Sequence, residues 1–223
     1  MMPLGDDNTG RRITPIVTYV LIALNVLVFF LELNNGEAFI QRWAFVPRRF
    51  LADPAGDFVT LFTAMFMHAG WLHLLGNMLY LWIFGDNVED RLGHGLFLAF
   101  YILCGLAATF AQLAFNMASE VPNLGASGAI AGVLGAYLIM FPRGRVRMLM
   151  GRMVVPMSAL AAIGIWFLLQ VFSQINAFTA SSQTEGGVAY MAHIGGFVAG
   201  VILTYLLGGN RRALPPSTSY RRY

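Results

Sequence analysis

The sequence predicts an all-α polytopic membrane protein with six transmembrane helices. Hydrophobic residues make up 57% of the 223 residues and charged residues only 11%, whereas a soluble domain carries about 25% charged residues. Long apolar runs alternate with short polar connections, and the arginines gather in those connections. Such clustering is typical of a membrane topology signal. The small net charge of +3 gives no reason to expect a nucleic-acid partner.

Six apolar segments are candidates for membrane spans. They are residues 15–33, 62–84, 96–118, 127–141, 154–172 and 188–207. The first segment is longer than the core of a typical signal peptide and lacks a small-x-small cleavage pattern, so we expect a retained helix. The fifth carries Pro156 in its first turn, where proline is tolerated. We expect a membrane domain over residues 15–208, an N-terminal tail over residues 1–14 and a C-terminal tail over residues 209–223.

The arginines orient the predicted bundle. An even number of spans puts both termini on one side, and the tails and connections on that side hold eleven of the fourteen basic residues. The opposite side holds only Arg42, Arg48 and Arg49. Because positive charge favours the cytoplasmic face, we predict that both termini are cytoplasmic. No amphipathic presequence precedes the first span, which favours a bacterial inner membrane.

The tetrapeptide Gly125-Ala126-Ser127-Gly128 opens the fourth apolar segment. Glycine on both sides lets the backbone turn sharply, and a serine at a helix start has free backbone N–H groups beside it. This arrangement suits a nucleophile with an oxyanion site, although an N-cap serine is the ordinary alternative. A helix from Ser127 to Phe141 spans only about 22 Å, short of the ~30 Å hydrocarbon core. We therefore expect Ser127 below the membrane surface.

Two histidines are expected at the depth of Ser127. His73 lies in the second apolar segment and His193 near the start of the sixth, and both segments run inward like the fourth. Polar side chains inside a membrane are costly and are therefore functional candidates. We predict that Ser127 is a nucleophile and that His193 is its general base.

Small residues on the two helix faces favour contact between them. Ala131 and Gly135 follow Ser127 on one face, while Gly196 and Gly200 follow His193 on the other. Small side chains let two helix backbones approach closely in lipid. Plain helix packing is the alternative reading of these faces.

The second segment supplies a candidate oxyanion site. His73 and Asn77 are four residues apart and therefore share a helix face. With the backbone N–H of Ser127 they could bind an oxyanion, and an interhelical polar clamp is the alternative. On the same helix His68 would lie about 140° round from His73, so we rank it below that pair. We expect His94 to be solvated in the inner connection.

Nothing in the sequence supplies an acid beside His193. Asp57, Glu120 and Glu185 all lie in outer loops, so we predict a Ser-His dyad rather than a triad. A catalytic zinc site needs about three converging ligands, and His73 and His193 come without an intramembrane carboxylate. We expect no metal and no cofactor.

Four motifs, taken in this order, resemble the rhomboid family of intramembrane serine proteases. They are His73-Leu-Leu-Gly-Asn77, Glu89-Asp-Arg91-Leu-Gly93, Gly125-Ala-Ser127-Gly128 and Ala192-His193-Ile-Gly-Gly196 with Gly200. The resemblance implies a six-helix rhomboid-like bundle with Ser127 as nucleophile and His193 as base. It implies that His73, Asn77 and the Ser127 backbone hold the oxyanion. It also implies that Glu89 and Arg91 form a structural polar anchor at the inner end of the second span.

The chain departs from the family pattern at two places. Many family members carry an aromatic residue four positions after the serine, stacked on the catalytic histidine, where this chain has Ala131. Some carry a Trp-Arg pair late in the first loop, where this chain has the reversed pair Arg42-Trp43. We therefore expect His193 to be held by other packing.

The resemblance implies an intramembrane serine endopeptidase that works in the lipid bilayer. Its expected substrates are transmembrane proteins, cut near the outer edge of their spans, and residues 173–187 are the expected cap over the site. One alternative is an inactive relative that binds transmembrane helices, but such proteins lose the serine or the histidine. Another is a small transporter, although the sequence offers neither an internal repeat nor an intramembrane carboxylate.

Overall fold

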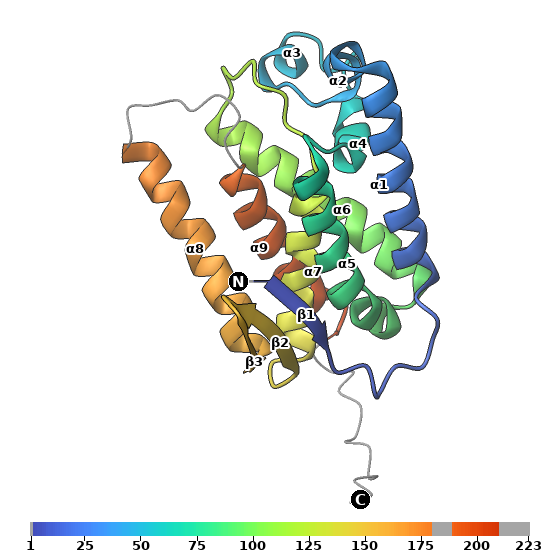
Figure 1. The fold of residues 1–223 in the computed structure, drawn as a ribbon. Coiled ribbons are helices and arrows are strands. Elements are labelled where there is room, and N and C mark those ends of the chain that lie inside the picture. Colours follow the sequence, from blue (N-terminus) through green and yellow to red (C-terminus); the bar gives the residue numbers. More distant parts are fainter. Residues whose placement is uncertain (1, 180–188, 210–223) are drawn as a thin grey trace, which may run out of the picture.

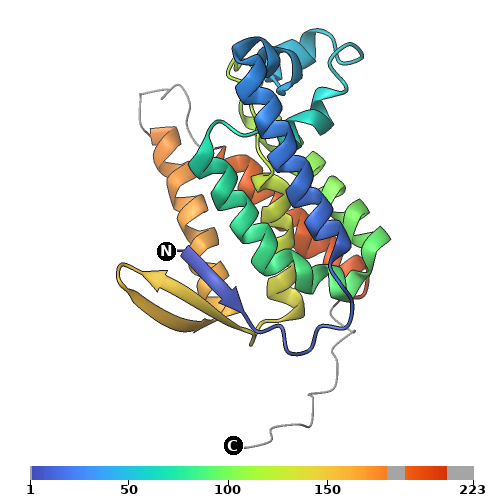
Figure 2. The same cartoon turned by 45° about the vertical axis from the view of Figure 1, so that its right-hand side comes forward.

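In the part of the chain that the structure describes, six longer helices alternate in direction, and a small sheet lies at one end of them (Figures 1 and 2). This computed structural model describes residues 2–179 and 189–209. The longer helices are α1 (Ile16–Asn35), α5 (Trp71–Leu92), α6 (His94–Phe115), α7 (Ser127–Met140), α8 (Ala159–Thr179) and α9 (Tyr190–Leu206). Four short helices cover the end opposite the sheet (Figure 1): α2 (Glu37–Trp43), α3 (Pro47–Ala52), α4 (Thr60–Thr63) and the 3₁₀ turn η1 (Ala64–Phe66).

Three described helices are long and apolar enough to cross a membrane. They are Ile16–Asn35, His94–Phe115 and Ala159–Asn176. The helices Ser127–Met140 and Tyr190–Leu206 are also apolar but shorter. Helix α5 is as long as α6, with 22 residues, but its last two turns carry charges. The chain is thus a mostly helical, multi-pass membrane protein.

Helix α7 lies at the centre of the bundle (Figure 1). Eleven of its 14 residues are buried, because its sequence is apolar all round, which is typical of a core helix. Helices α5, α6, α8 and α9 all contact it. The helix that begins with Ser127 is therefore enclosed by the other elements, as a site below the membrane surface requires.

The second predicted span begins and ends later than the sequence indicated. Residues 62–70 contain the end of α4, the η1 turn and a non-helical stretch, so the helix starts at Trp71 rather than at residue 62. It then continues to Leu92, through the charged residues expected to form a connection. The reason is a buried carboxylate: Glu89 has no exposed surface. It accepts hydrogen bonds from the backbone N–H of Val17 at 2.9 Å and of Thr18 at 2.7 Å.

Those two donors lie in the first turn of α1, where backbone N–H groups lack helical acceptors. Glu89 thereby caps α1 from a neighbouring helix, and its charge is favoured at a helix N-terminus. It also meets His94 at the start of α6, with Nδ1 2.5 Å from Oε1. The guanidinium of Arg91 lies 4.7 Å from the ring centre of Phe141. These contacts make the end of α5 a junction of several helices.

A three-stranded antiparallel sheet corrects the all-α prediction. Strands β1 (Met2–Asp6), β2 (Arg145–Met150) and β3 (Met153–Ser158) pair in the order β1-β2-β3. The predicted N-terminal tail, residues 1–14, thus contains a strand, β1. Pro156, expected in the first turn of a helix, lies in β3, an edge strand, where proline is tolerated. The residues between β2 and β3 form a two-residue turn in which Gly151 supplies a positive φ of 63°, as hairpin turns favour.

Helix α8 therefore begins at Ala159 rather than at residue 154 and extends to Thr179. The cap expected over residues 173–187 is helical in its first part, and residues 180–188 lie outside the described residues. Most of the C-terminal tail, residues 210–223, lies outside them as well.

Candidate active site

Ser127 is the first residue of α7, at the end of a loop that enters the bundle. Two contacts hold that loop: Asn123 pairs with Phe45 in an isolated antiparallel bridge, and the N–H of Gly125 donates to the carbonyl oxygen of Ala64 at 2.9 Å. Non-helical backbone at membrane depth needs such partners within the protein. The N–H groups at the start of α7 have no acceptor within the helix, so they remain beside the serine hydroxyl.

Gly125 is required by both conformation and space. Its φ is +133°, a conformation that residues with a side chain rarely adopt. A Cβ at this position would lie 2.9 Å from Cε1 of His73. The glycine thus lets the loop pass directly against the imidazole of His73 and brings that ring close to Ser127.

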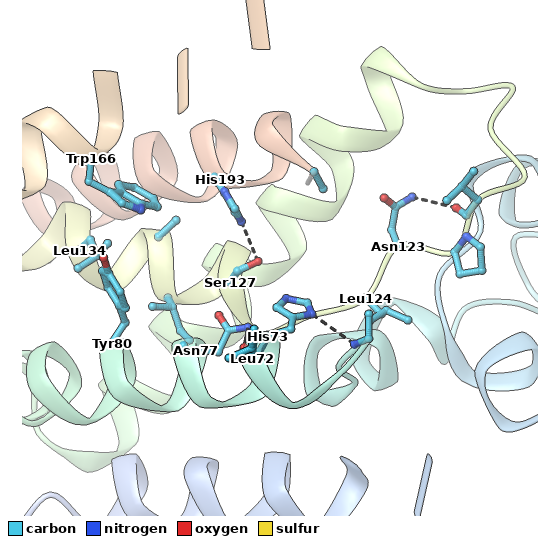
Figure 3. Close-up of a pocket in the computed structure, with 17 residues that line it drawn as sticks. Leu72, His73, Asn77, Tyr80, Asn123, Leu124, Ser127, Leu134, Trp166 and His193 are labelled. Carbon is cyan, nitrogen blue, oxygen red and sulfur yellow. Dashed lines mark hydrogen bonds between the residues drawn. The ribbon is translucent and has the colours of Figure 1, made fainter. Parts of the chain in front are cut away.

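The side chains of Ser127 and His193 are in hydrogen-bond contact (Figure 3). The Ser127 Oγ lies 2.8 Å from the His193 Nε2. The contact depends on glycines between α7 and α9: a Cβ on Gly196 would lie 2.0 Å from the carbonyl oxygen of Gly128. The small face predicted on α9 therefore does approach α7, where Gly128 and Gly132, rather than the predicted Ala131, lie against it.

Two residues of α8 hold the imidazole of His193, and the sequence analysis did not single out either. The Oε1 of Gln170 lies 2.7 Å from the His193 Nδ1. The ring centre of Trp166 lies 5.9 Å from that of His193, with 38° between the ring planes. Trp166 supplies the aromatic contact that Ala131, fully buried in α7, does not. A signal for Gln170 was present, since an amide in the apolar run 159–172 is costly in a membrane.

His73 and Asn77 lie in the first two turns of α5, on the other side of Ser127. The Nδ1 of His73 accepts a hydrogen bond from the Ala69 N–H at 3.3 Å, so its proton is on Nε2. That nitrogen is the one beside Gly125. Asn77 donates to the carbonyl oxygen of His73 at 3.1 Å, which uses one of the two hydrogens of its amide. The pair thus carries N–H donors on the side of α5 that faces α7.

A cavity of about 570 Å³ joins these groups. Ser127, His193, His73 and Asn77 all line it. In Figure 3 they lie in its middle, with Trp166 and Tyr80 toward one end and Asn123 toward the other. Four sequence-predicted site residues therefore share one cavity, with N–H donors and a Ser-His contact on opposite walls.

The other two histidines do not line this cavity. His68 lies in the non-helical stretch before α5 and is buried, with 2% of its surface exposed. Its ring meets that of His73 edge-on at 5.0 Å, and its backbone N–H donates to Glu32 at 3.0 Å. His94 is exposed over 45% of its side chain, as expected for a solvated residue, and it also bonds Glu89. That bond forms because α5 continues to Leu92 and places Glu89 beside the start of α6.

Carboxylates lie away from His193 among the described residues. Asp57 pairs with Arg49 at 2.8 Å and Glu120 with Arg48 at 2.5 Å, while Glu185 lies outside the described residues. Within residues 2–179 and 189–209, no group of three histidine, cysteine or acidic side chains could hold a metal ion.

Comparison with known proteins assigns the family. The Rhomboid domain model matches residues 55–210. Rhomboid protease GluP of Bacillus subtilis is 33% identical over 196 residues, which cover 87% of this chain and 35% of that protein. Rhomboid protein 1, mitochondrial, of Saccharomyces cerevisiae is 29% identical over 191 residues, which cover 83% of this chain and 51% of that protein.

The human presenilin-associated rhomboid-like protein, mitochondrial, is 30% identical over 210 residues, covering 87% of this chain and 50% of that protein. The chain thus spans between about a third and a half of the length of these relatives. Since the domain model covers more than half of the sequence, from the end of the first loop to the last helix, this chain belongs to the rhomboid family.

Proposed function

We propose that the chain is an intramembrane serine endopeptidase that cleaves transmembrane segments of membrane proteins. The observation that carries the proposal is the 2.8 Å contact between Ser127 Oγ and His193 Nε2 on the wall of a cavity inside the bundle. A serine and an imidazole in hydrogen-bond contact are the minimum for an activated hydroxyl nucleophile. Membership of the rhomboid family and the relative named as a rhomboid protease support the same reaction class.

The proposed mechanism uses two proton transfers through His193. As Ser127 Oγ bonds to the scissile carbonyl carbon, its proton passes to Nε2 of His193, and the carbonyl oxygen takes the negative charge. When the tetrahedral intermediate collapses, the C–N bond breaks and the imidazolium gives its proton to the leaving amine. Water then attacks the acyl-enzyme by the same route and frees Ser127.

The proposed oxyanion site is formed by His73, Asn77 and the backbone N–H of Ser127. The His73 Nε2–H and the Asn77 amide lie on α5, across the cavity from the start of α7. Donors that are already fixed around developing negative charge stabilise the transition state without having to reorganise.

The topology belongs to this proposal too. We infer six spans, α1, α5, α6, α7, α8 and α9, from their alternating direction (Figure 1). We propose that the membrane domain is residues 15–208, that both termini are cytoplasmic, as the arginine distribution favours, and that the membrane is a bacterial inner membrane. Ser127 then lies toward the outer face, so substrates are cut near the outer end of their spans. A cleavable span needs helix-weakening residues, because an intact helix holds its carbonyl oxygens in hydrogen bonds.

The test is cleavage of a labelled transmembrane substrate by purified protein in proteoliposomes. We expect Ser127→Ala and His193→Ala to abolish cleavage, and a fluorophosphonate probe to label the wild type but not Ser127→Ala. Ser119→Ala, in the loop before α7 and away from the cavity, is the matched control and should cleave normally. Cleavage retained by Ser127→Ala would overturn the nucleophile assignment. A wild type that binds the substrate without cleaving it would favour the inactive relative.

A further inference from the structure

Both ring nitrogens of His193 have partners on different helices. Nε2 meets the hydroxyl of Ser127 on α7 at 2.8 Å, and Nδ1 meets the amide oxygen of Gln170 on α8 at 2.7 Å. A neutral imidazole carries one proton, on one nitrogen or the other. The amide oxygen is an acceptor only, so it is satisfied only when Nδ1 carries that proton.

The tautomer decides whether His193 can act as a base. With the proton on Nδ1, Nε2 presents a lone pair and accepts the hydrogen of the Ser127 hydroxyl. With the proton on Nε2, a lone pair on Nδ1 would face the lone pairs of Gln170, and the serine would lose its proton acceptor. The partner of the second nitrogen sets the tautomer of a functional histidine in this way.

We propose that Gln170 is the positioning residue of this site, fixing the tautomer and the orientation of His193 as an uncharged third member beside the serine and histidine. This inference rests on the proposed function for its kinetic consequence. Gln170 does not line the cavity, so it acts through the imidazole rather than on the substrate.

The neutral amide fits the location. In a soluble serine hydrolase a carboxylate occupies this place and also stabilises the imidazolium that forms. A carboxylate in an apolar span is costly, whereas an amide oxygen accepts the same hydrogen bond without a buried charge. Gln170 is the only amide or charged side chain in the run 159–172.

Trp166 holds the imidazole of His193 by a contact between the two rings, in addition to the hydrogen bond with Gln170. It lies four residues before Gln170, so both side chains project from one face of α8. Its ring lies 5.9 Å from that of His193 and 6.4 Å from that of Phe197. One helix thus holds the imidazole through its Nδ1 and against its ring plane.

The direct test is the tautomer itself, read from ¹⁵N chemical shifts of imidazole-labelled protein. The four histidines are resolved by comparison with His193→Gln. We expect Nδ1 of His193 to be protonated in the wild type, and Gln170→Met, which keeps the length without the acceptor, to give a tautomer mixture. Gln112→Met is the matched control. Gln112 of α6 accepts from the Ala192 N–H at 3.2 Å but does not contact the imidazole, so the tautomer should not change.

Kinetics supply the second readout. Gln170→Met should lower kcat by about 10- to 100-fold, the range found when the hydrogen-bond partner that orients a metal-bound histidine is removed. KM should stay constant, since Gln170 does not line the cavity. Gln170→Glu should restore most of kcat and shift the acidic limb of the pH–kcat profile to higher pH, because a carboxylate favours the protonated ring.

The outcomes separate the two claims. An unchanged tautomer and unchanged kcat in Gln170→Met would overturn the positioning role while leaving the protease intact. A wild type that cleaves nothing, with a tautomer that still depends on Gln170, would overturn the proposed function and retain the positioning role. If Gln170→Met does not fold, the pH profile and tautomer of Gln170→Glu decide the question.

Discussion

Helix α9 is packed in opposite ways on its two sides. Toward α7 the contact is backbone against backbone: a Cβ on Gly200 would lie 2.1 Å from the carbonyl oxygen of Gly132. Toward α8 the contact is made by rings, with Phe167 stacked on Phe197 at 4.3 Å. Much of α8 is exposed, including Leu168, with 66% of its surface accessible.

The difference separates two requirements of the site. The distance between Ser127 and His193 is set by the glycine contact, which has almost no freedom because interiors are close-packed. The orientation of the imidazole is set by α8, which has fewer buried side chains to fix it. We call the α7 side of α9 the tight side and the α8 side the loose side. Stability should therefore fall when volume is added on the tight side, and activity should fall when contacts are lost on the loose side.

The largest expected effect comes from adding one methyl group on the tight side. Gly200→Ala places a Cβ against the Gly132 backbone, and we expect a loss of about 3 kcal/mol of stability, at the upper end for overpacking. Gly164→Ala on α8 meets nothing within 4 Å and should gain about 0.5–1 kcal/mol, since alanine is favoured over glycine in helices. Thermal unfolding in detergent measures both, and equal tolerance of the two changes would contradict the contrast.

The next prediction compares two glycines with positive φ, one beside the site and one away from it. The comparison separates the cost of backbone strain from the effect of contact with the site. Gly125→Ala and Gly36→Ala both force a residue with a side chain into a positive φ, +133° and +64°, at a cost of about 1–3 kcal/mol each. Only Gly125→Ala also pushes against His73, because Gly36 has nothing within 4 Å. We expect similar losses of stability, but a loss of cleavage only in Gly125→Ala. Normal cleavage by that variant would argue against a role for His73.

A smaller effect is expected for Trp166→Ala on the loose side, and its measured quantity is kcat rather than stability. The imidazole loses its ring contact while the glycine contact between α7 and α9 is untouched. We expect kcat to fall by about tenfold, or roughly 1.4 kcal/mol of transition-state stabilisation, and KM to rise as well, because Trp166 lines the cavity. Leu168→Ala on the exposed side of α8 is the control and should leave kcat unchanged. Equal effects of the two truncations would refute a specific role for Trp166.

The smallest effect concerns the sheet that leads into α8. Asp6 of β1 accepts hydrogen bonds from Tyr137 and Asn87, both at 2.7 Å. Burial raises the pKa of Asp6 to about 6, and the nearby charge of Asp86 adds to the rise. The folded protein thus binds this proton more tightly than the unfolded chain. Its contribution is complete below the ordinary pKa of 3.8 and is lost as the pH rises through about 6.

Hydrogen exchange of the β1 amides should therefore quicken between about pH 4 and pH 6 by more than the rise of the intrinsic exchange rate with pH. Asp6→Asn should remove this excess, because asparagine does not titrate. The amides at the Ser127 end of α7 should show no such excess, since Asp6 bonds that helix near its other end, at Tyr137. An excess that persists in Asp6→Asn would assign the titration to another group.

Individual residues show which parts of the fold can be predicted from local sequence patterns and which cannot. The start of α7 at Ser127 follows from the glycine-flanked turn and the apolar run after it, both local. The start of α5 at Trp71 and its continuation to Leu92 do not, because the charged end of α5 is stabilised by its cap on α1, a contact between distant segments. Strand β1 was missed for the same reason, since its partner lies 140 residues away.

The sequence by itself determined the membrane class, the two helices that carry Ser127 and His193, and the small face of α9 that lets these helices approach each other. Helical periodicity and the cost of polar groups in lipid are local properties, so they can be read along the chain. Only the tertiary structure decided which side chain meets Nδ1 of His193 and which ring replaces the one missing at Ala131. Those contacts depend on how α8 turns relative to α9, and the packing of two separate helices leaves no periodic trace in either sequence.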